Sequence, residues 1–177
     1  DQVLRNHFEA KGLYKIMKSE DSEQLQQAKN KAARYCVGAE RSPHQVLTKL
    51  QLYGLELEDA LVALESLKEA NFTNEKRFVS AFVNDKFIFN KWGKIKIAIE
   101  LRKHKINSSL IEEGLSTLDP ANYELKIEEL IDQKWGQLQT EEKFLIKKKK
   151  TCQFVFSKGF ESHLVLARFD QKFKYLP

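Results

Sequence analysis

Two neighbouring segments decide the fold: residues 67–79 read LKEANFTNEKRFV, and residues 91–106 read KWGKIKIAIELRKHKI. In the first segment a helical pattern ends before Asn71, a residue type that tolerates the left-handed conformation of a helix stop. Thr73 or Asn74 then begins a new helix, because either side chain can accept hydrogen bonds from the free N–H groups of the next turn. The second segment carries a dense row of cations beside apolar residues. Together they predict a helix junction followed by a basic helix.

The start of that basic helix contains a local conflict. Residues 94–101 begin with alternating polar and apolar side chains, which is the pattern of a half-buried strand. The alternation fails at Ala98, and the segments that align with this one on either side end in helix stops. We therefore predict a helix here.

The same plan recurs along the chain. Helix stops at Gly54, Lys105 and Gly159 recur at nearly equal spacing, and an apolar residue follows each of them. Self-similarity at a fixed period predicts a tandem array whose repeats bury their apolar faces on one another. The residues four positions before each stop are expected to be buried, each in its own repeat: Leu50, Leu101 and Val155.

The helices of the first repeat can be placed from local signals. A helix is predicted over residues 22–35, and Ser42 with Pro43 begins a second helix, which Gly54 ends. A third follows at helical spacing over residues 57–67. We predict a loosely attached arm at residues 1–21 and three-helix repeats, as follows: residues 22–70, 71–118 and 119–177.

Composition agrees with a helical, globular chain. The 177 residues are 42% hydrophobic and 31% charged, with only 7 Gly and 3 Pro, which disfavours loop-rich β architectures. The net charge of +5 permits an acidic partner. We expect no membrane span and no signal peptide, because the sequence lacks a long apolar run. Cys36 and Cys152 match no metal or redox spacing, which favours buried free thiols in a reducing cytoplasm.

At this point the residues resemble the regulatory protein RecX family, whose members modulate the RecA recombinase. The resemblance covers about residues 25–169 and is most specific in the two opening segments. The family pattern is matched by five residues: Arg77, Phe78, Gly93, Leu101 and Ile106. Four residues depart from it and replace Gly, Asp, Ala and Gly respectively: Asn71, Asn74, Val79 and Lys105. Lys105 adopts positive φ less readily than the glycine it replaces.

The resemblance implies an all-α fold of three tandem three-helix repeats in an elongated, curved, right-handed array. It also implies binding in the groove of RecA–DNA filaments, with suppression of filament growth, ATP hydrolysis and strand exchange in DNA repair and recombination. The expected partners are the RecA filament and, weakly, single- or double-stranded DNA. The protein is expected to be a cytoplasmic monomer.

Other function classes find less support. No phosphate-binding loop, dinucleotide turn or nucleophile elbow occurs, so an enzyme is not expected and no cofactor is predicted. The histidines are scattered without a partner at i+4, so no metal site is predicted: His7, His44, His104 and His163. Two alternatives stay open, namely a sequence-independent nucleic-acid-binding protein that acts without a recombinase and a structural helical scaffold. A requirement for the recombinase in binding would separate them from a RecA regulator.

Basic clusters on two helices are the candidate filament- and DNA-binding site. A charge run is often only a solvated face, but corresponding helices placed side by side would form one basic strip that binds phosphates. Such binding should weaken with salt, while reversal of these charges should change stability little. Phe89 and Trp92 are expected to pack in the core or between repeats, with stacking on bases as the alternative, and Trp135 is expected to pack at the end of a helix. The candidate residues are Lys94, Lys96, Arg102, Lys103, Lys147, Lys148, Lys149 and Lys150.

Overall fold

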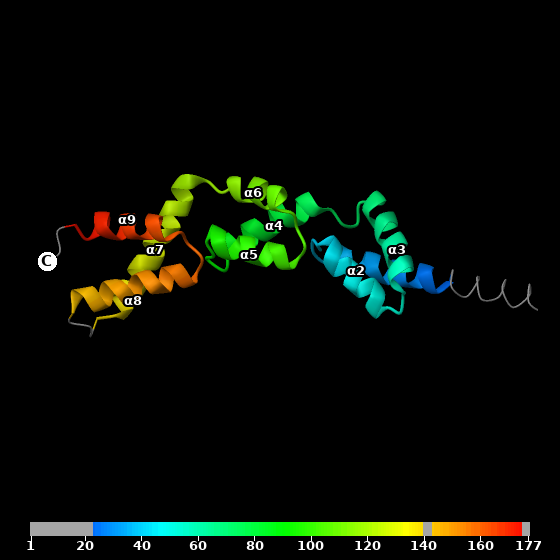
Figure 1. The fold of residues 1–177 in the computed structure, drawn as a ribbon, viewed down its shortest axis with the longest axis horizontal. Coiled ribbons are helices and arrows are strands. Elements are labelled where there is room, and N and C mark those ends of the chain that lie inside the picture. Colours follow the sequence, from blue (N-terminus) through cyan, green and yellow to red (C-terminus); the bar gives the residue numbers. More distant parts are fainter. Residues whose placement is uncertain (1–22, 140–142, 175–177) are drawn as a thin grey trace, which may run out of the picture. The chain divides into compact units, whose positions relative to one another are not determined.

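A computed structural model describes residues 23–139 and 143–174, and all regular structure within these ranges is helical (Figure 1). A helix over residues 23–37 is followed by α2 Pro43–Leu52, α3 Leu57–Glu69, α4 Glu75–Ile88, α5 Lys94–Lys103, α6 Ser108–Ser116, α7 Pro120–Gln137, α8 Phe144–Ser157 and α9 Ser162–Lys172. For these ranges the predicted all-α class is confirmed, including the helix at residues 94–101. No helix within them is long and apolar enough to cross a membrane. The predicted arm at residues 1–21 lies outside the described residues.

The chain divides into two compact units within α4. The first compact unit ends at Phe78 and the second begins at Val79. In the described part of the chain, nine helices follow one another with the short connections that tandem three-helix repeats require. The boundaries of the repeats, at residues 22–70, 71–118 and 119–177, stay a prediction.

The predicted helix stops are confirmed by the backbone conformation. Gly54 and Gly159 have φ of 96° and 88°, and Asn71 and Lys105 have φ of 59° and 60° without being glycine. At Lys105 the stop is closed by the Ile106 N–H, which donates to the carbonyl five residues earlier at 3.3 Å. The same bond forms after Gly54 and after Asn71. This pattern satisfies carbonyl groups that the end of a helix leaves free.

The helix starts also follow from the sequence. Ser42 Oγ accepts from the Gln45 N–H at 3.2 Å, and Gln45 Oε1 accepts from the Ser42 N–H at 3.0 Å, which completes the predicted capping box. Asn107 and Asp119 cap α6 and α7 with their side chains. Pro120 occupies the first turn of α7, where its missing N–H has no cost.

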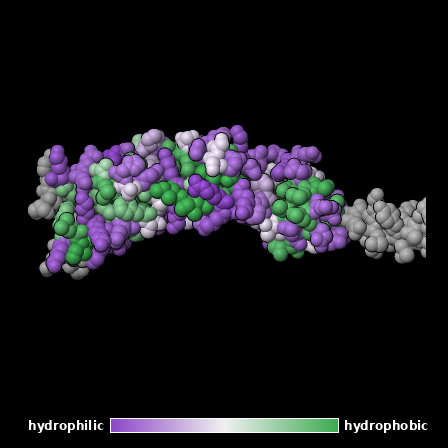
Figure 2. All heavy atoms as spheres, viewed as in Figure 1, coloured by the Kyte–Doolittle hydropathy of each residue, from purple (hydrophilic) through white to green (hydrophobic). Residues whose placement is uncertain are grey.

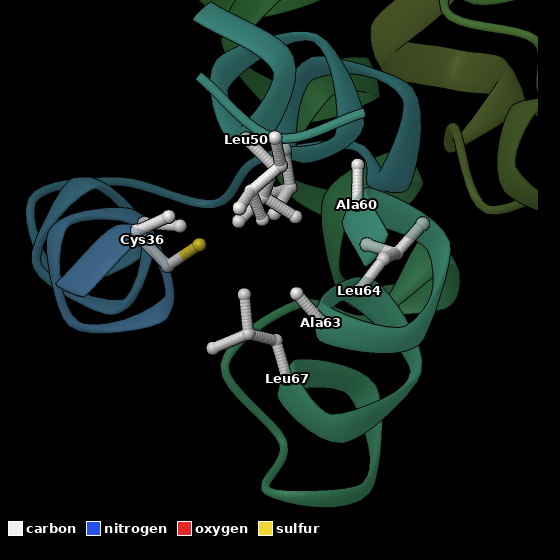
Figure 3. Packing of buried hydrophobic residues seen from close by; sticks show 10 residues of the cluster. Cys36, Leu50, Ala60, Ala63, Leu64 and Leu67 are labelled. Carbon is white, nitrogen blue, oxygen red and sulfur yellow. The ribbon is translucent and has the colours of Figure 1, made fainter. Parts of the chain in front are cut away.

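The core of the first compact unit lies between α2, α3 and the helix over residues 23–37. Figure 3 shows Cys36, Leu50 and Leu67 from these three helices pointing toward a common centre. Leu50 is fully buried, and so are Leu101 and Val155 of the second compact unit. The prediction that these three equivalent positions are buried is therefore confirmed. The predicted free, buried thiols are confirmed as well: Cys36 and Cys152.

The start of α4 is attached to the loop before α2. Thr73 Oγ1 donates to the Arg41 carbonyl at 2.7 Å, and Arg77 Nε forms an ion pair with Glu40 Oε1 at 2.8 Å. Arg77 also donates to the carbonyl and the side-chain oxygen of Asn71. One arginine thus connects the left-handed stop of α3 to the loop that precedes α2.

Aromatic side chains fill the space between α7, α8 and α9. The Trp135 ring lies 4.4 Å from Phe173 and 5.5 Å from Phe169, measured between centroids, and Phe144 packs at its edge. Such edge and tilted contacts are the preferred geometry of buried aromatic pairs. The expectation that Trp135 is a packing residue is confirmed.

Candidate nucleic-acid interface

The start of α5 and the end of α8 form one hydrogen-bonded junction. The Gly93 N–H donates to the Lys158 carbonyl at 2.9 Å, and the Ile95 N–H donates to the Gly159 carbonyl at 3.1 Å. Each helix end otherwise has backbone groups without a partner inside the helix. The carbonyls at the end of α8 therefore satisfy N–H groups at the start of α5, and this junction holds the lysines of α5 in place.

Two glycines permit this close backbone approach. A Cβ added at Gly93 would lie 2.3 Å from the Gly159 carbonyl oxygen, and one added at Gly159 would lie 2.3 Å from Lys96 Cβ. Neither distance is possible for real atoms without a shift of the backbone. Gly159 thus both ends α8 at positive φ and leaves room for α5.

A buried tyrosine ties α7 and α9 to the same junction. Tyr123 Oη accepts from the Lys94 N–H at 2.9 Å and donates to Glu161 Oε2 at 2.6 Å. Its ring stacks on Phe87 and lies against Phe160, both of them buried. Burial, together with the bond to the Glu161 carboxylate, raises the pKa of the Tyr123 phenol, so the neutral hydroxyl is retained.

The lysines at the start of α5 lie over aromatic rings. Lys94 Nζ is 4.9 Å from the centroid of the Tyr123 ring, and Lys96 Nζ is 4.8 Å from that of Trp92. Lys96 Nζ also reaches the Ser157 carbonyl at 3.5 Å. Within the described ranges neither ammonium group pairs with a carboxylate. Both lysines are half-buried, which orders them more than a solvated lysine would be.

The other two candidates of this helix lie at its far end. Arg102 is exposed. Lys103 forms an ion pair with Glu100 at 2.6 Å. The hydrogen bond from Lys103 is the main cause that lowers the pKa of Glu100. Lys103 is thus partly neutralised, in contrast to the lysines at the α5 start.

The four lysines of the run 147–150 lie in the first half of α8 and differ from one another. Lys147 Nζ is 4.2 Å from the centroid of the Trp135 ring, while Lys148 forms an ion pair with Asp170 at 2.5 Å. Lys149 and Lys150 are exposed. Lys148 and Lys149 also line a hollow of about 330 Å³ between α8 and α9, whose other walls are mostly apolar.

The structure does not place α5 and α8 side by side. Their ends meet at the α5–α8 junction, so Lys94 and Lys96 lie beside the last turn of α8. At 1.5 Å per residue, the run 147–150 lies roughly 10–15 Å farther along α8. The candidates therefore fall into three groups rather than the one strip expected from the sequence: the junction lysines (Lys94 and Lys96), Arg102 with Lys103 at the far end of α5, and the lysine run of α8.

Two features of this region could not be found from the sequence pattern. Lys158 belongs to the junction, since its carbonyl accepts from Gly93, but in the sequence it is only the residue before a helix stop. Phe89 is 78% exposed, so the expectation that it packs inside the array is wrong. Trp92 is half-buried beneath Lys86 and Lys96.

The described residues give no support to metal binding or to a reactive thiol. Within the described residues, no group of three His, Cys, Asp or Glu side chains could hold a metal ion. Burial raises the pKa of both thiols, Cys36 and Cys152, which favours the neutral and less nucleophilic form.

Comparison with known proteins now gives the family. The model of the second three-helix domain of RecX matches residues 74–115, which contain α4 and α5. A regulatory protein RecX from Clostridium botulinum (strain Alaska E43 / Type E3) is 32% identical over 156 residues, which cover 82% of this chain and 73% of that protein. The chain belongs to the RecX family of regulatory proteins.

A second RecX protein supports the same assignment, and two crystal structures share the fold. One from Clostridium botulinum (strain Eklund 17B / Type B) is 31% identical over 68% of this chain and 56% of its own length. The fold matches the crystal structure of RecX from Lactobacillus salivarius with a TM-score of 0.77, at 17% identity, over 85% of this chain and 97% of that one. A second crystal structure of regulatory protein RecX gives a TM-score of 0.79 at 18% identity, over 88% of this chain and 76% of that one.

Proposed function

We propose that this RecX-family protein inhibits RecA by binding RecA–DNA filaments and suppressing filament growth, ATP hydrolysis and strand exchange. It would act as a binding protein rather than an enzyme, in the cytoplasm, where it would regulate DNA repair and recombination. The proposal combines the resemblance to the RecX family with one observation, the junction lysines that no carboxylate neutralises among the described residues.

The physical basis is the charge of the partner. A nucleoprotein filament is a polyanion, and each lysine that contacts a phosphate releases condensed counterions. Lys94 and Lys96 are already ordered by their aromatic neighbours, so they lose less conformational freedom on binding than solvated lysines would. Inhibition then follows if the protein binds the filament in a state that cannot add subunits or complete ATP turnover.

The test is the ATPase activity of a cognate RecA on single-stranded DNA, with and without this protein. We expect the protein to lower the rate of ATP hydrolysis, and less so as salt is raised. Lys68→Glu is the matched control for charge reversal at Lys94 and Lys96. Lys68 is exposed, lies in the first compact unit and already pairs with Glu65. An unchanged ATPase rate at protein concentrations that saturate DNA would contradict the proposal.

A second candidate function is sequence-independent nucleic-acid binding without a recombinase. The observation in its favour is again the set of lysines beside aromatic rings, which would bind protein-free DNA equally well. Binding of equal strength to DNA with and without RecA, together with an unchanged ATPase rate, would favour this candidate.

A further inference from the structure

The loop between α4 and α5 combines an exposed aromatic ring with lysines that have no acidic partner among residues 23–139 and 143–174. Phe89 follows the last residue of α4, and its N–H still bonds to the Asp85 carbonyl at 3.0 Å, so the helical path continues to this residue. Its side chain is 78% exposed, whereas Phe87 two positions earlier is buried. The Phe89 ring therefore does not contribute to the core of this unit.

Three lysines lie in this loop or beside it. Lys86 lies three residues before Phe89 and so shares a helix face with it. Lys86 Nζ and Lys96 Nζ approach the same Trp92 ring, at 5.3 and 4.8 Å from its centroid. Lys91 lies within the loop at φ 54°, and the Trp92 N–H closes the loop by donating to the Lys86 carbonyl at 3.0 Å.

The charges of these lysines are not compensated locally. Asp85 precedes Lys86, and Glu100 lies one turn after Lys96, but Glu100 pairs with Lys103 instead. Within the described ranges, no ion pair joins Lys86, Lys91 or Lys96 to a carboxylate. Several lysines elsewhere do have such partners: Lys68, Lys103, Lys126, Lys148 and Lys172. The loop is therefore a local excess of positive charge.

Apolar surface continues from the loop onto α5. Figure 2 shows hydrophobic residues at the surface over α5, next to hydrophilic ones. The exposed apolar side chains of this region are Ile88, Phe89, Ile95 and Ile99. Cations interleaved with exposed apolar and aromatic side chains are typical of surfaces that bind unpaired bases and phosphates at once.

We propose that the α4–α5 loop binds single-stranded nucleic acid directly, with Phe89 stacking on a base while Lys86, Lys91 and Lys96 contact the flanking phosphates. Stacking requires an unpaired base, which selects single strands over duplexes, and it is tolerant of sequence because every base has a flat face. Trp92 does not stack on a base, because Lys86 and Lys96 already lie over its ring; it positions the two lysines. The inference concerns contact with nucleic acid itself and does not depend on the proposed inhibition of RecA.

The stacking is tested with a fluorescein-labelled oligo(dT) of about thirty nucleotides, titrated with the full chain in the absence of any recombinase. Phe89→Ala should weaken binding roughly tenfold, the loss expected for one base–aromatic stack, and Phe89→Trp should retain it. Phe72→Ala is the matched control, because Phe72 is also exposed, at 38%, but lies in the first compact unit. Binding to a duplex of the same length should be the same for Phe89→Ala and the parent protein.

The phosphate contacts are tested by the salt dependence of the same titration. Lys86→Gln combined with Lys91→Asn should reduce the slope of log K against log salt by about 1.4, because each lost contact to a single strand removes about 0.7. Asn is chosen at position 91 because it tolerates positive φ. Lys126→Gln, which removes a lysine already paired with Glu129, should leave the slope unchanged.

The outcomes separate this inference from the proposed function. If Phe89→Ala binds oligo(dT) as tightly as Phe72→Ala, or if the lysine variant keeps the parent slope, the inference is overturned even where RecA inhibition is observed. If Phe89 is required for oligo(dT) binding while the RecA ATPase is unaffected by the protein, the inference stands and the proposed function fails. Circular dichroism and thermal unfolding of each variant show whether a loss of binding reflects a loss of fold.

Discussion

The junction lysines and the lysine run of α8 differ in what holds them. Lys94 and Lys96 lie over the rings of Tyr123 and Trp92, at a place where the backbones of α5 and α8 touch. The run 147–150 lies on α8 away from this place: Lys147 lies over Trp135, Lys148 pairs with Asp170, and the other two lysines are exposed. The most conspicuous charge pattern in the sequence is thus not the one that lies where two helix ends meet. Damage to the junction should affect the first group and spare the second.

The largest effect on stability is expected from truncating a buried side chain of α5. Leu101→Ala truncates a fully buried side chain and should lower the free energy of unfolding by roughly 2–5 kcal/mol. Leu145→Ala near the start of α8 is the control, because Leu145 is 77% exposed and its loss should stay within about 0.5 kcal/mol. Urea unfolding measures both. Equal losses for the two variants would mean that the repeat register of Leu101 is wrong.

A smaller but more local effect is expected from Gly93→Ala. The new Cβ would lie 2.3 Å from the Gly159 carbonyl oxygen, so the ends of α5 and α8 must separate. Overpacking of this kind costs about 1–3 kcal/mol. The control is Gly136→Ala in α7, where an added Cβ meets nothing within 4 Å and the helix propensity improves. Thermal unfolding of the two variants should shift in opposite directions, and a neutral Gly93→Ala would rule out a tight junction.

Removing the Tyr123 hydroxyl should lower the free energy of unfolding by less than Gly93→Ala does. It should also change how the stability of the protein depends on pH. Tyr123→Phe leaves the Lys94 N–H and the Glu161 carboxylate without this partner, at about 1 kcal/mol. The raised pKa of Tyr123 stabilises the folded state fully below the unfolded pKa of about 10, and this contribution is lost as the pH rises above that value. The parent should therefore lose more stability than Tyr123→Phe between pH 9 and about 11.

Tyr53→Phe in the first compact unit serves as the control for that comparison, because it leaves the Tyr123 hydroxyl and its bond to Glu161 in place. A Tyr123→Phe variant that loses stability as steeply as the parent would show that another group governs the alkaline unfolding. The measurement is the urea midpoint as a function of pH.

Charge reversal should separate the two groups by function, and the smallest effect on stability is expected for the α8 pair. Reversing Lys94 and Lys96 together removes two cation–aromatic contacts, at about 1–2 kcal/mol, which exceeds the change expected from the sequence. Reversing Lys148 and Lys149 should cost about 0.5 kcal/mol. Inhibition of RecA ATPase should weaken roughly tenfold for the junction pair and less for the α8 pair, with a flatter salt dependence in both. Full inhibition by both variants across a salt titration would show that neither group binds the filament.

Much of the helical framework could be predicted because its signals are local. Each stop needs one residue that tolerates positive φ, and the bonds that close it span only a few positions, as at Gly54 and Lys105. The capping box of Ser42 spans three residues. Leu50, Leu101 and Val155 are buried because the 3.6-residue period fixes which face of each helix is apolar.

The site required information that no local pattern contains. The sequence by itself determined the helix ends, the buried faces and the positions of the lysines along their helices. Only the tertiary structure decided that Lys96 reaches the Ser157 carbonyl 61 residues away, that the ends of α5 and α8 meet, and that Phe89 is exposed. The reason is that backbone propensity and side-chain period act over one or two helical turns. The meeting of two helix ends depends instead on the missing side chains of two distant glycines and on the hydrogen bonds that their absence permits.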